Sequence, residues 1–240
     1  MLATRDLVGE LMDDPTLAAQ AHNAALHGLR RINWISGTAA ALWPRIERVL
    51  RAHPDAGASL LDVACGGGDV AIAVARRAQR HGFPLNVQGC DFSDVALEHA
   101  SRAARHADVA VKFFRADVTT DALPQHYTFI TCTLFLHHLT DVRIAALLRG
   151  LAGSTDHLLV SDLVRSPMGY LLAWIGTRLL SGSPIVHEDG LRSVRAALNV
   201  TEAGALAREA GLQGVCFERQ WPQRFLMTWS REQDASHGSA

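Results

Sequence analysis

Acidic and glycine residues lie close together in the segment Leu60–Asp69, which reads LLDVACGGGD. An apolar run leads into Asp62, a glycine cluster begins at Gly66, and an alanine-rich segment of helical pattern follows from Val70. Glycines at such a junction let the backbone adopt positive φ and approach a ligand closely. The helix adds unpaired N–H groups and the positive end of its dipole at the same place. The segment therefore predicts a binding site for a nucleotide-type cofactor at the carboxyl end of a strand.

Two further carboxylates follow apolar runs of the same kind. Asp91 ends the run from Leu85, and Asp117 comes just after the run 109–114. Open α/β sheets bind ligands at the carboxyl ends of their parallel strands. We therefore expect these two side chains to lie at the same edge of the sheet as Asp62.

The glycine spacing also fits a dinucleotide-binding fingerprint. Gly66, Gly68 and Ala71 follow the pattern GxGxxA, and Asp91 comes about 20 residues later, where that fingerprint has its acidic residue. The local pattern alone therefore leaves a nicotinamide dinucleotide open as the cofactor.

Four motifs, in the right order over residues 58–230, resemble those of the class I S-adenosylmethionine-dependent methyltransferases. The motifs are Leu61–Gly68, Gly89–Ser93, Arg115–Val118 and Tyr127–Leu139. The first of these motifs has Ala64 where that family usually has Gly, and the side chain of Ala64 restricts φ at one position of the turn. Their order favours a methyltransferase over a dehydrogenase.

This resemblance implies S-adenosylmethionine as the cofactor and gives three carboxylates roles. Asp91 would accept both ribose hydroxyls, and Asp117 would meet the adenine amino group. Asp62 would orient the glycine loop or, through water, the methionine ammonium. Asp69 is expected to cap the following helix. The other expected cofactor contacts are Ala64, Cys65, Gly66, Gly68, Phe92, Val118 and Leu134.

Alternating strand and helix patterns predict a doubly wound α/β fold with a seven-stranded, mostly parallel sheet. The closing strands, 214–219 and 224–230, are joined by four residues and must be antiparallel neighbours, so the last strand is antiparallel. Residues 1–57 are predicted to form a helical N-terminal cap, with a helix over 38–52 that contains Pro44. Residues 58–232 are expected to form the methyltransferase domain that the resemblance implies, with a helical insertion at about 163–200, and 233–240 are expected to form a disordered tail.

Three histidines are candidates for acid–base chemistry, because an unperturbed imidazole titrates near neutrality. His137 and His138 end the fourth predicted strand, where a methyl acceptor would sit, although such a pair also suits a structural role at this turn. His187 is expected with Glu188 and Asp189 on a loop over the cleft, where a merely solvated loop explains them nearly as well. No metal site is expected, because no part of the sequence brings enough ligands together.

The insertion contains the segment Met168–Leu180, which is apolar nearly all round as a helix. It is too short to cross a bilayer, and Arg178 interrupts it. It could be a core helix packed on the sheet, or it could dock on a membrane surface. The third hypothesis is that Tyr170, Leu171 and Trp174 line a pocket for a hydrophobic acceptor.

Bulk composition describes a globular chain of 240 residues, long enough for one α/β domain with an added cap. Lys and Arg number 23 against 24 Asp and Glu, with no basic block, so a nucleic-acid partner is not expected. No apolar run is long enough to span a membrane. The amino terminus does not resemble a signal peptide, and the four cysteines are widely spaced, so we expect a cytoplasmic protein.

We therefore predict methyl transfer from S-adenosylmethionine to a small hydrophobic or aromatic acceptor, such as a phenol, polyketide or lipid-like molecule. Within the superfamily the chain looks closest to the ubiquinone and menaquinone methyltransferases. O-methylation is favoured because a poised histidine suffices to take a phenolic proton. The alternatives are an NAD(P)-dependent oxidoreductase and a non-catalytic scaffold that binds S-adenosylmethionine. Neither the acceptor nor an oligomeric state follows from the sequence.

Overall fold

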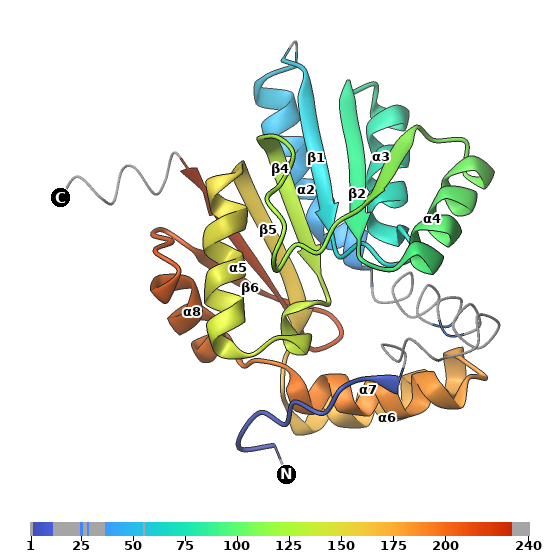
Figure 1. The fold of residues 1–240 in the computed structure, drawn as a ribbon, viewed down its shortest axis with the longest axis vertical. Coiled ribbons are helices and arrows are strands. Elements are labelled where there is room, and N and C mark those ends of the chain that lie inside the picture. Colours follow the sequence, from blue (N-terminus) through green and yellow to red (C-terminus); the bar gives the residue numbers. More distant parts are fainter. Residues whose placement is uncertain (1, 12–24, 26–27, 29–36, 55, 232–240) are drawn as a thin grey trace.

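A twisted sheet of seven strands forms the centre of the computed structural model, which describes residues 2–11, 25, 28, 37–54 and 56–231 (Figure 1). The strand order is β3-β2-β1-β4-β5-β7-β6. The strands are β1 (Ala58–Val63), β2 (Leu85–Asp91), β3 (Val111–Arg115), β4 (Tyr127–Thr133), β5 (Thr155–Leu163), β6 (Cys216–Gln220) and β7 (Arg224–Ser230).

Strands β1 to β5 pair in parallel, and β7 runs antiparallel to both β5 and β6, so six strands share one direction and only β7 opposes it. Parallel neighbours need a crossover, which the helices provide, whereas the short link between β6 and β7 forces the chain to reverse. The helices of the sheet are α2 (Thr38–Ala52), α3 (Asp69–His81), α4 (Asp94–His106), α5 (Asp141–Gly153) and α8 (Val200–Glu209). This arrangement confirms the predicted fold class, including its antiparallel last strand.

Alternation along the strands divides the core between the two faces of the sheet. Leu60 and Phe129 pack with α2 and α3 on one face. Their neighbours Leu61 and Ile130 pack with α5 and α8 on the other face. All four side chains are fully buried, as expected for strands of a parallel sheet that helices cover on both sides.

Local signals in the sequence set the helix boundaries near the cofactor edge. Ser93 caps α4, since its Oγ accepts a hydrogen bond from the N–H of Ala96 at 3.3 Å. The expectation that Asp69 caps α3 is wrong, because the N-cap is Gly68 in a left-handed conformation and Asp69 is the first helical residue. Helix α2 has the predicted bounds and contains Pro44. Much of the predicted N-terminal cap, residues 12–24 and 29–36, lies outside the described residues, as does the tail 233–240.

The insertion forms a helical hairpin, α6 (Pro167–Leu180) and α7 (Pro184–Ala196), which lies beyond the carboxyl ends of the strands (Figure 1). The predicted loop at His187–Asp189 is wrong, because these residues belong to α7. Pro184 is in the first turn, where its fixed φ and missing N–H favour the start of a helix.

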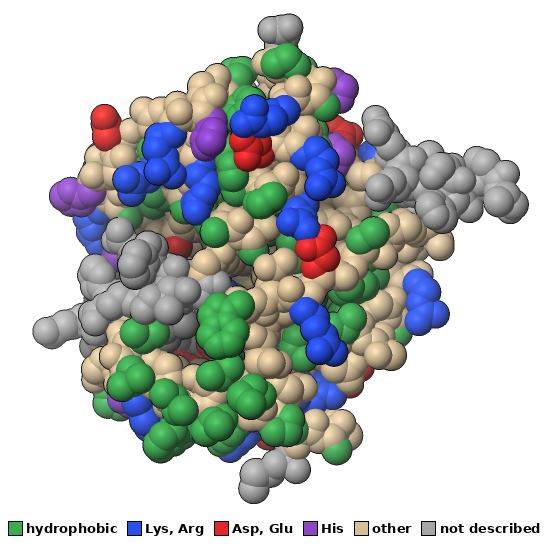
Figure 2. Space-filling model, turned by 180° about the vertical axis from the view of Figure 1, so that it is seen from behind, with side chains coloured by type: hydrophobic (Ala, Val, Ile, Leu, Met, Phe, Trp, Pro, Cys, Tyr) green, Lys and Arg blue, Asp and Glu red, His purple; other side chains and the backbone are tan. Residues whose placement is uncertain are grey.

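Helix α6 is not a core helix on the sheet, which corrects one of the three interpretations of the insertion. It packs on α7, and its only buried residues are Gly169 and Thr177. Figure 2 shows hydrophobic side chains gathered on the surface at this end of the molecule. The exposed apolar side chains of α6 are Met168, Leu171, Trp174, Ile175 and Leu179.

The N-terminal segment 2–11 lies along α7 and the short 3-10 helix η2 (Leu136–His138) (Figure 1). Arg5 donates to the carbonyls of Leu139 at 2.9 Å and Ala196 at 2.8 Å. The N–H of Asp6 donates to the carbonyl of Arg195 at 3.1 Å. No helix in the described ranges has the length and hydropathy of a membrane span.

Candidate functional site

The loop between β1 and α3 has the backbone shape that the glycine cluster predicted. Ala64, Gly66 and Gly68 all have positive φ, of 50°, 50° and 77°. The N–H of Cys65 donates to the carbonyl of Cys90 at 3.0 Å, which ties the loop to the end of β2. Ala64 therefore occupies a conformation that favours glycine, and L-residues hold it at a strain of about 1–2 kcal/mol.

The glycines of this loop serve two different purposes. A Cβ added to Gly66 would meet nothing within 4 Å, so the loop is open there to an approaching ligand. A Cβ added to Gly68 would lie 2.8 Å from the Phe113 ring and 2.9 Å from Ala100. Gly68 is thus required by the packing of α3 against β3 and α4 as well as by its positive φ.

Asp62 is a buried carboxylate directly before this loop, with 1% of its surface exposed. Its Oδ1 accepts from Thr131 Oγ1 at 2.7 Å, and the backbone N–H of Ala71 also favours the ionised form. Its Oδ2 is buried and makes no hydrogen bond of normal geometry within the described part of the chain. Burial raises the pKa of Asp62 to about 7 despite these donors. A cationic ligand group nearby, directly or through water, would satisfy this oxygen.

Asp91 holds the glycine loop to the end of β2. Its Oδ2 accepts from the N–H of Gly66 at 2.8 Å, and its Oδ1 accepts from the N–H of Ser93 at 2.9 Å. The side chain is 7% exposed and lies at the carboxyl edge of the sheet, as predicted. Each carboxylate oxygen can accept more than one hydrogen bond, so these contacts are compatible with ribose hydroxyls as further donors.

The other expected cofactor residues surround the same edge. Phe92 is 56% exposed, next to Asp91, and offers an aromatic face. Asp117 is exposed after β3, and its Oδ1 accepts from the hydroxyl of Thr119 at 2.7 Å and from its N–H at 2.9 Å, contacts that lower the pKa of Asp117. Val118 is half-buried against the core. Leu134 follows β4 with φ of 55°, and its N–H donates to the carbonyl of Ser161 at 2.8 Å.

These residues fit S-adenosylmethionine on observations of this chain alone. Gly66 is open, the buried Asp62 has an unsatisfied oxygen, and Asp91 lies at the end of the neighbouring strand. A cofactor with a nucleoside at one end and an ammonium at the other matches that order of groups. The cysteines of the loop region are unsuited to chemistry, because burial raises the pKa values of the Cys65 and Cys90 thiols.

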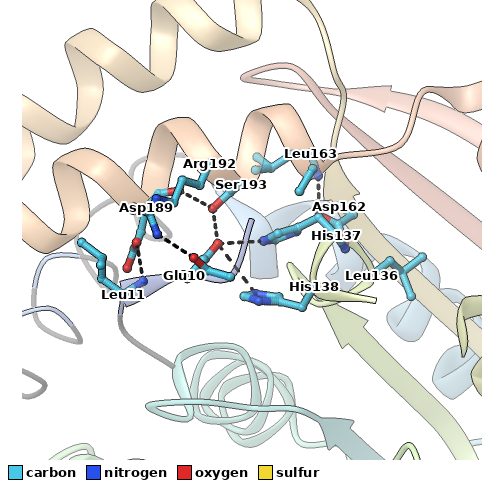
Figure 3. A network of polar contacts seen from close by, with 12 residues as sticks. Glu10, Leu11, Leu136, His137, His138, Asp162, Leu163, Asp189, Arg192 and Ser193 are labelled. Carbon is cyan, nitrogen blue, oxygen red and sulfur yellow. Dashed lines mark hydrogen bonds and ion pairs between the residues drawn. The ribbon is translucent and has the colours of Figure 1, made fainter. Parts of the chain in front are cut away.

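A polar network joins the exit of β4 to the N-terminal segment (Figure 3). His137 Nδ1 lies 2.6 Å from Asp162 Oδ1, and its Nε2 lies 3.5 Å from Glu10 Oε1. The His138 ring packs against that of His137, tilted by 32° with ring centroids 4.4 Å apart, and its Nε2 lies 3.9 Å from the same Glu10 oxygen. Ser193 Oγ, from α7, donates to Glu10 Oε1 as well. The structure thus brings together two of the three predicted catalytic histidines.

The charges of this network support one another. Burial disfavours the imidazolium of His137, but Asp162 and Glu10 outweigh this effect and raise the pKa of His137 to about 10. Burial likewise disfavours the carboxylates of Asp162 and Glu10, but the histidines outweigh it and lower both pKa values. His137 is therefore a buried cation between two anions near neutral pH.

His187 lies apart from this network, on α7. Its Nε2 is 2.7 Å from the carbonyl of Ser181 and must donate to it, which secures the turn between α6 and α7. Of the predicted acceptor-binding residues, Leu171 and Trp174 are 49% and 46% exposed. The Tyr170 hydroxyl accepts from Arg195 Nη2 at 2.9 Å.

Sequence reasoning missed three members of the network: Glu10, Asp162 and Ser193. Asp162 had a usable signal, because it lies near the end of β5 just as Asp91 ends β2. Glu10 had none, since its partners lie far along the chain and the segment around it has no regular pattern.

The strand order, the open glycine loop and the acids at the carboxyl edge together define the fold of a class I methyltransferase. A family described as a methyltransferase domain matches residues 60–155. The protein named ubiquinone biosynthesis O-methyltransferase is 31% identical in Ralstonia nicotianae over 192 residues, which cover 76% of this chain and 68% of that protein. Its namesake in Pseudomonas aeruginosa (strain UCBPP-PA14) is 29% identical, covering 76% and 70%.

Solved structures give the same fold. An O-methyltransferase family 2 protein from Planctomyces limnophilus, in complex with apigenin, has a TM-score of 0.61 at 20% identity, covering 91% of this chain and 63% of that one. Magnesium protoporphyrin IX methyltransferase from Synechocystis PCC 6803, with bound SAH, has a TM-score of 0.57 at 18% identity, covering 82% and 83%. The chain belongs to the class I S-adenosylmethionine-dependent methyltransferases, and its cofactor is S-adenosylmethionine.

Proposed function

We propose that this enzyme methylates a hydroxyl group of a small, hydrophobic or aromatic acceptor. The observation that carries the proposal is the similarity, over 76% of the chain, to proteins named ubiquinone biosynthesis O-methyltransferase. The bound cofactor supplies a methyl group that its positive sulfur already makes electrophilic. The protein then has to align the acceptor oxygen, exclude water and remove one proton.

On the cofactor side, we propose that Asp91 accepts the ribose hydroxyls while it continues to hold Gly66. Asp117 and Phe92 would contact the adenine, and Asp62 would face the ammonium. The support for these roles is the position of each side chain at the carboxyl edge and the unsatisfied buried oxygen of Asp62. Contacts from the backbone and side chains of Ala64, Cys65, Gly66, Gly68, Val118 and Leu134 complete the proposed cofactor site.

On the acceptor side, we propose that the exposed face of α6 supplies apolar contacts through Tyr170, Leu171 and Trp174. The hairpin lies beyond the carboxyl ends of the strands (Figure 1), the edge at which the proposed cofactor site would present the methyl group. Burying a large apolar side chain against an acceptor contributes up to about 1.5–3 kcal/mol, so this face favours apolar acceptors. The same face suits peripheral contact with a membrane that holds a lipid-like acceptor.

Removal of the hydroxyl proton is assigned to a histidine. His137 is already protonated between two carboxylates, which leaves it unsuited to accept a proton. His187 has its Nε2 committed to Ser181 and only Nδ1 to offer. His138 has a side chain that is 24% exposed at the exit of β4, so it is the best placed of the three. Loss of a general base lowers turnover by about 10²–10⁴-fold.

A panel of hydroxylated aromatic acceptors tests this function. Phenols and catechols with and without an apolar tail are incubated with the enzyme and S-adenosylmethionine, and the products are identified by mass spectrometry. We expect transfer to oxygen, faster with the apolar tail, and no transfer to analogues whose hydroxyls are already methyl ethers. Transfer to carbon would contradict O-methylation, and cofactor binding without any transfer would favour the scaffold alternative. Binding of NADH in place of S-adenosylmethionine would favour the oxidoreductase.

We also propose that the enzyme acts in the cytoplasm on a small molecule rather than on a nucleic acid. All four cysteines are free thiols in the structure, and Cys90 and Cys132 are buried. Free buried thiols are typical of proteins from a reducing compartment. The balance of 23 basic and 24 acidic residues, without a basic block, argues against a nucleic acid as the acceptor.

A further inference from the structure

Three side chains from distant parts of the chain direct potential ligand atoms at one point. Glu10 offers Oε1 from the N-terminal segment, and His137 and His138 offer ring nitrogens from η2. All three atoms lie within 4.8 Å of one another. Figure 3 shows the two rings and the carboxylate facing one another beneath α7.

The separations match ligands around an ion better than hydrogen bonds. The two Nε2 atoms lie 3.5 and 3.9 Å from Glu10 Oε1, beyond the 2.7–3.2 Å of a normal N–H···O bond. Ligands at about 2.0–2.1 Å from a tetrahedral zinc ion lie about 3.4 Å from each other. The pair formed by His137 and Glu10 already has that spacing, and His138 needs to approach by about half an ångström.

The surroundings of His137 are those of a metal-binding histidine. Its Nδ1 is 2.6 Å from the buried carboxylate of Asp162, which fixes the ring and leaves Nε2 directed at Glu10. A carboxylate bonded to the far nitrogen of a ligand histidine is the usual second shell of zinc sites, where it orients the ring and raises its basicity. Asp162 is itself held by the N–H of Leu163 at 2.7 Å.

We propose that Glu10, His137 and His138 bind a divalent first-row transition cation, with zinc as the best match. The cation would take the place of the Nε2 proton that His137 holds in the metal-free network, because a ligand histidine is neutral and metal binding releases its proton. Two imidazoles and one carboxylate favour zinc over magnesium or calcium, which prefer oxygen ligands. Three protein ligands leave a fourth tetrahedral position for an oxygen of water or of the acceptor. The sequence predicted no metal site, because it gave no sign that Glu10 would join the two histidines.

This inference deepens the proposed function and rests on it for its catalytic consequence. A cation at this point would bind the acceptor hydroxyl and lower its pKa, so that the hydroxyl proton passes to water. The acceptor oxygen would then take the methyl group from the sulfur of the cofactor, and His138 would serve as a ligand instead of as the base. The binding of the cation itself does not depend on the identity of the acceptor. An ion-pair network alone would use the same residues to fasten the N-terminal segment without binding metal.

Metal binding by the purified, chelator-treated full chain separates these two roles. We expect isothermal titration with Zn²⁺ to give one tight equivalent, and Co²⁺ to give the intense absorption of a four-coordinate site. Glu10→Gln and His138→Ala should each weaken this binding at least about tenfold, and Asp162→Asn by about 10–100-fold, the range for a second-shell carboxylate. The matched control is His126→Ala, because His126 forms an exposed pair with Asp156 at 2.8 Å and should leave the affinity unchanged.

Two outcomes would overturn the metal site: no Zn²⁺ binding by the wild-type chain, or binding by Glu10→Gln and His138→Ala that is as tight as in the wild-type chain. Either result means that the network only holds the N-terminal segment in place by ion pairs. Circular dichroism and thermal melts establish that each variant is folded. Methylation assays with and without the cation then test the catalytic consequence separately. Tight binding with no methylation of any hydroxyl would retain the metal site and reject the proposed function.

Discussion

Replacing Asp62 with Asn tests whether this buried carboxylate lowers the free energy of unfolding while it strengthens cofactor binding. Because one pKa unit corresponds to about 1.36 kcal/mol, the rise from 3.8 to about 7 amounts to about 4 kcal/mol against the folded state once the carboxylate ionises. Asn keeps the acceptor for Thr131 but loses the favourable effect of the Ala71 N–H. We therefore expect a gain in unfolding free energy of about 1–3 kcal/mol at pH 8.

The sign of the pH dependence follows from the direction of the shift. Between about pH 4 and 7 the folded state keeps a proton on Asp62 that the unfolded chain has released, so wild-type stability falls as pH rises. Above about pH 7 both states are ionised and the effect is constant. The stability advantage of Asp62→Asn should thus be absent near pH 4, grow up to pH 7 and then level off.

Urea denaturation at a series of pH values, without cofactor, measures this difference directly. Asp6→Asn is the control, since Asp6 is exposed on the surface. Calorimetry at pH 8 should also show that Asp62→Asn binds S-adenosylmethionine about 10–100-fold more weakly, as expected for loss of a charged contact. Parallel stability curves for wild type and variant, with equal cofactor affinity, would refute both parts of the reasoning.

Three other substitutions test the geometry of the fold and the loop. Ala64→Gly relieves a positive φ and should raise the unfolding free energy by about 1 kcal/mol in denaturant titrations; a loss of stability would argue against a left-handed Ala64. Asp91→Asn places an amide donor against the N–H of Gly66 or Ser93, so calorimetry should show S-adenosylmethionine binding at least about tenfold weaker, whereas unchanged affinity would remove Asp91 from the site. Gly190→Ala puts a Cβ 2.5 Å from Thr177 Cγ2 between α6 and α7 and should lower the free energy of unfolding in denaturant titrations by about 1–3 kcal/mol. The control Gly204→Ala, whose Cβ would make only an ordinary contact at 3.7 Å, should not lower it. Equal effects of the two substitutions would contradict the packing of the hairpin.

The cofactor half of the site could be predicted from the sequence because its signals are local. A strand, a glycine turn and a helix follow one another from Leu60, and parallel pairing brings the end of β2 beside the end of β1 without further information. Asp62 and Asp91 therefore needed only their positions at strand ends. The sequence did not predict that Gly68 is also required for close packing, because the side chain that its Cβ would meet, Phe113, comes from β3.

The acceptor half could not be predicted because its signals are not local. Residues 187–189 read as a loop, since three ionisable residues follow a proline. In α7 they point in different directions: His187 bonds to the α6–α7 turn, Glu188 is exposed and Asp189 is buried. The apolar pattern of α6 was recognised, but apolarity alone does not say whether a helix is buried. Glu10 meets His137 because contacts from distant parts of the chain hold the N-terminal segment against η2 and α7, among them those of Arg5 and Ser193.

The boundary between the cofactor half and the acceptor half of the candidate site lies close to the boundary of the matched methyltransferase domain. The matched methyltransferase domain ends at residue 155, before Asp162 and the hairpin of α6 and α7, and it excludes the segment that carries Glu10. The part that binds the cofactor is thus the part shared with a broad family, as expected when every member uses the same methyl donor. The segments outside it surround the exit of β4, where the acceptor has to reach the methyl group. If the two proposals hold, acceptor choice in this chain depends on groups that the fold alone does not specify: the exposed face of α6 and the cluster of Glu10, His137 and His138.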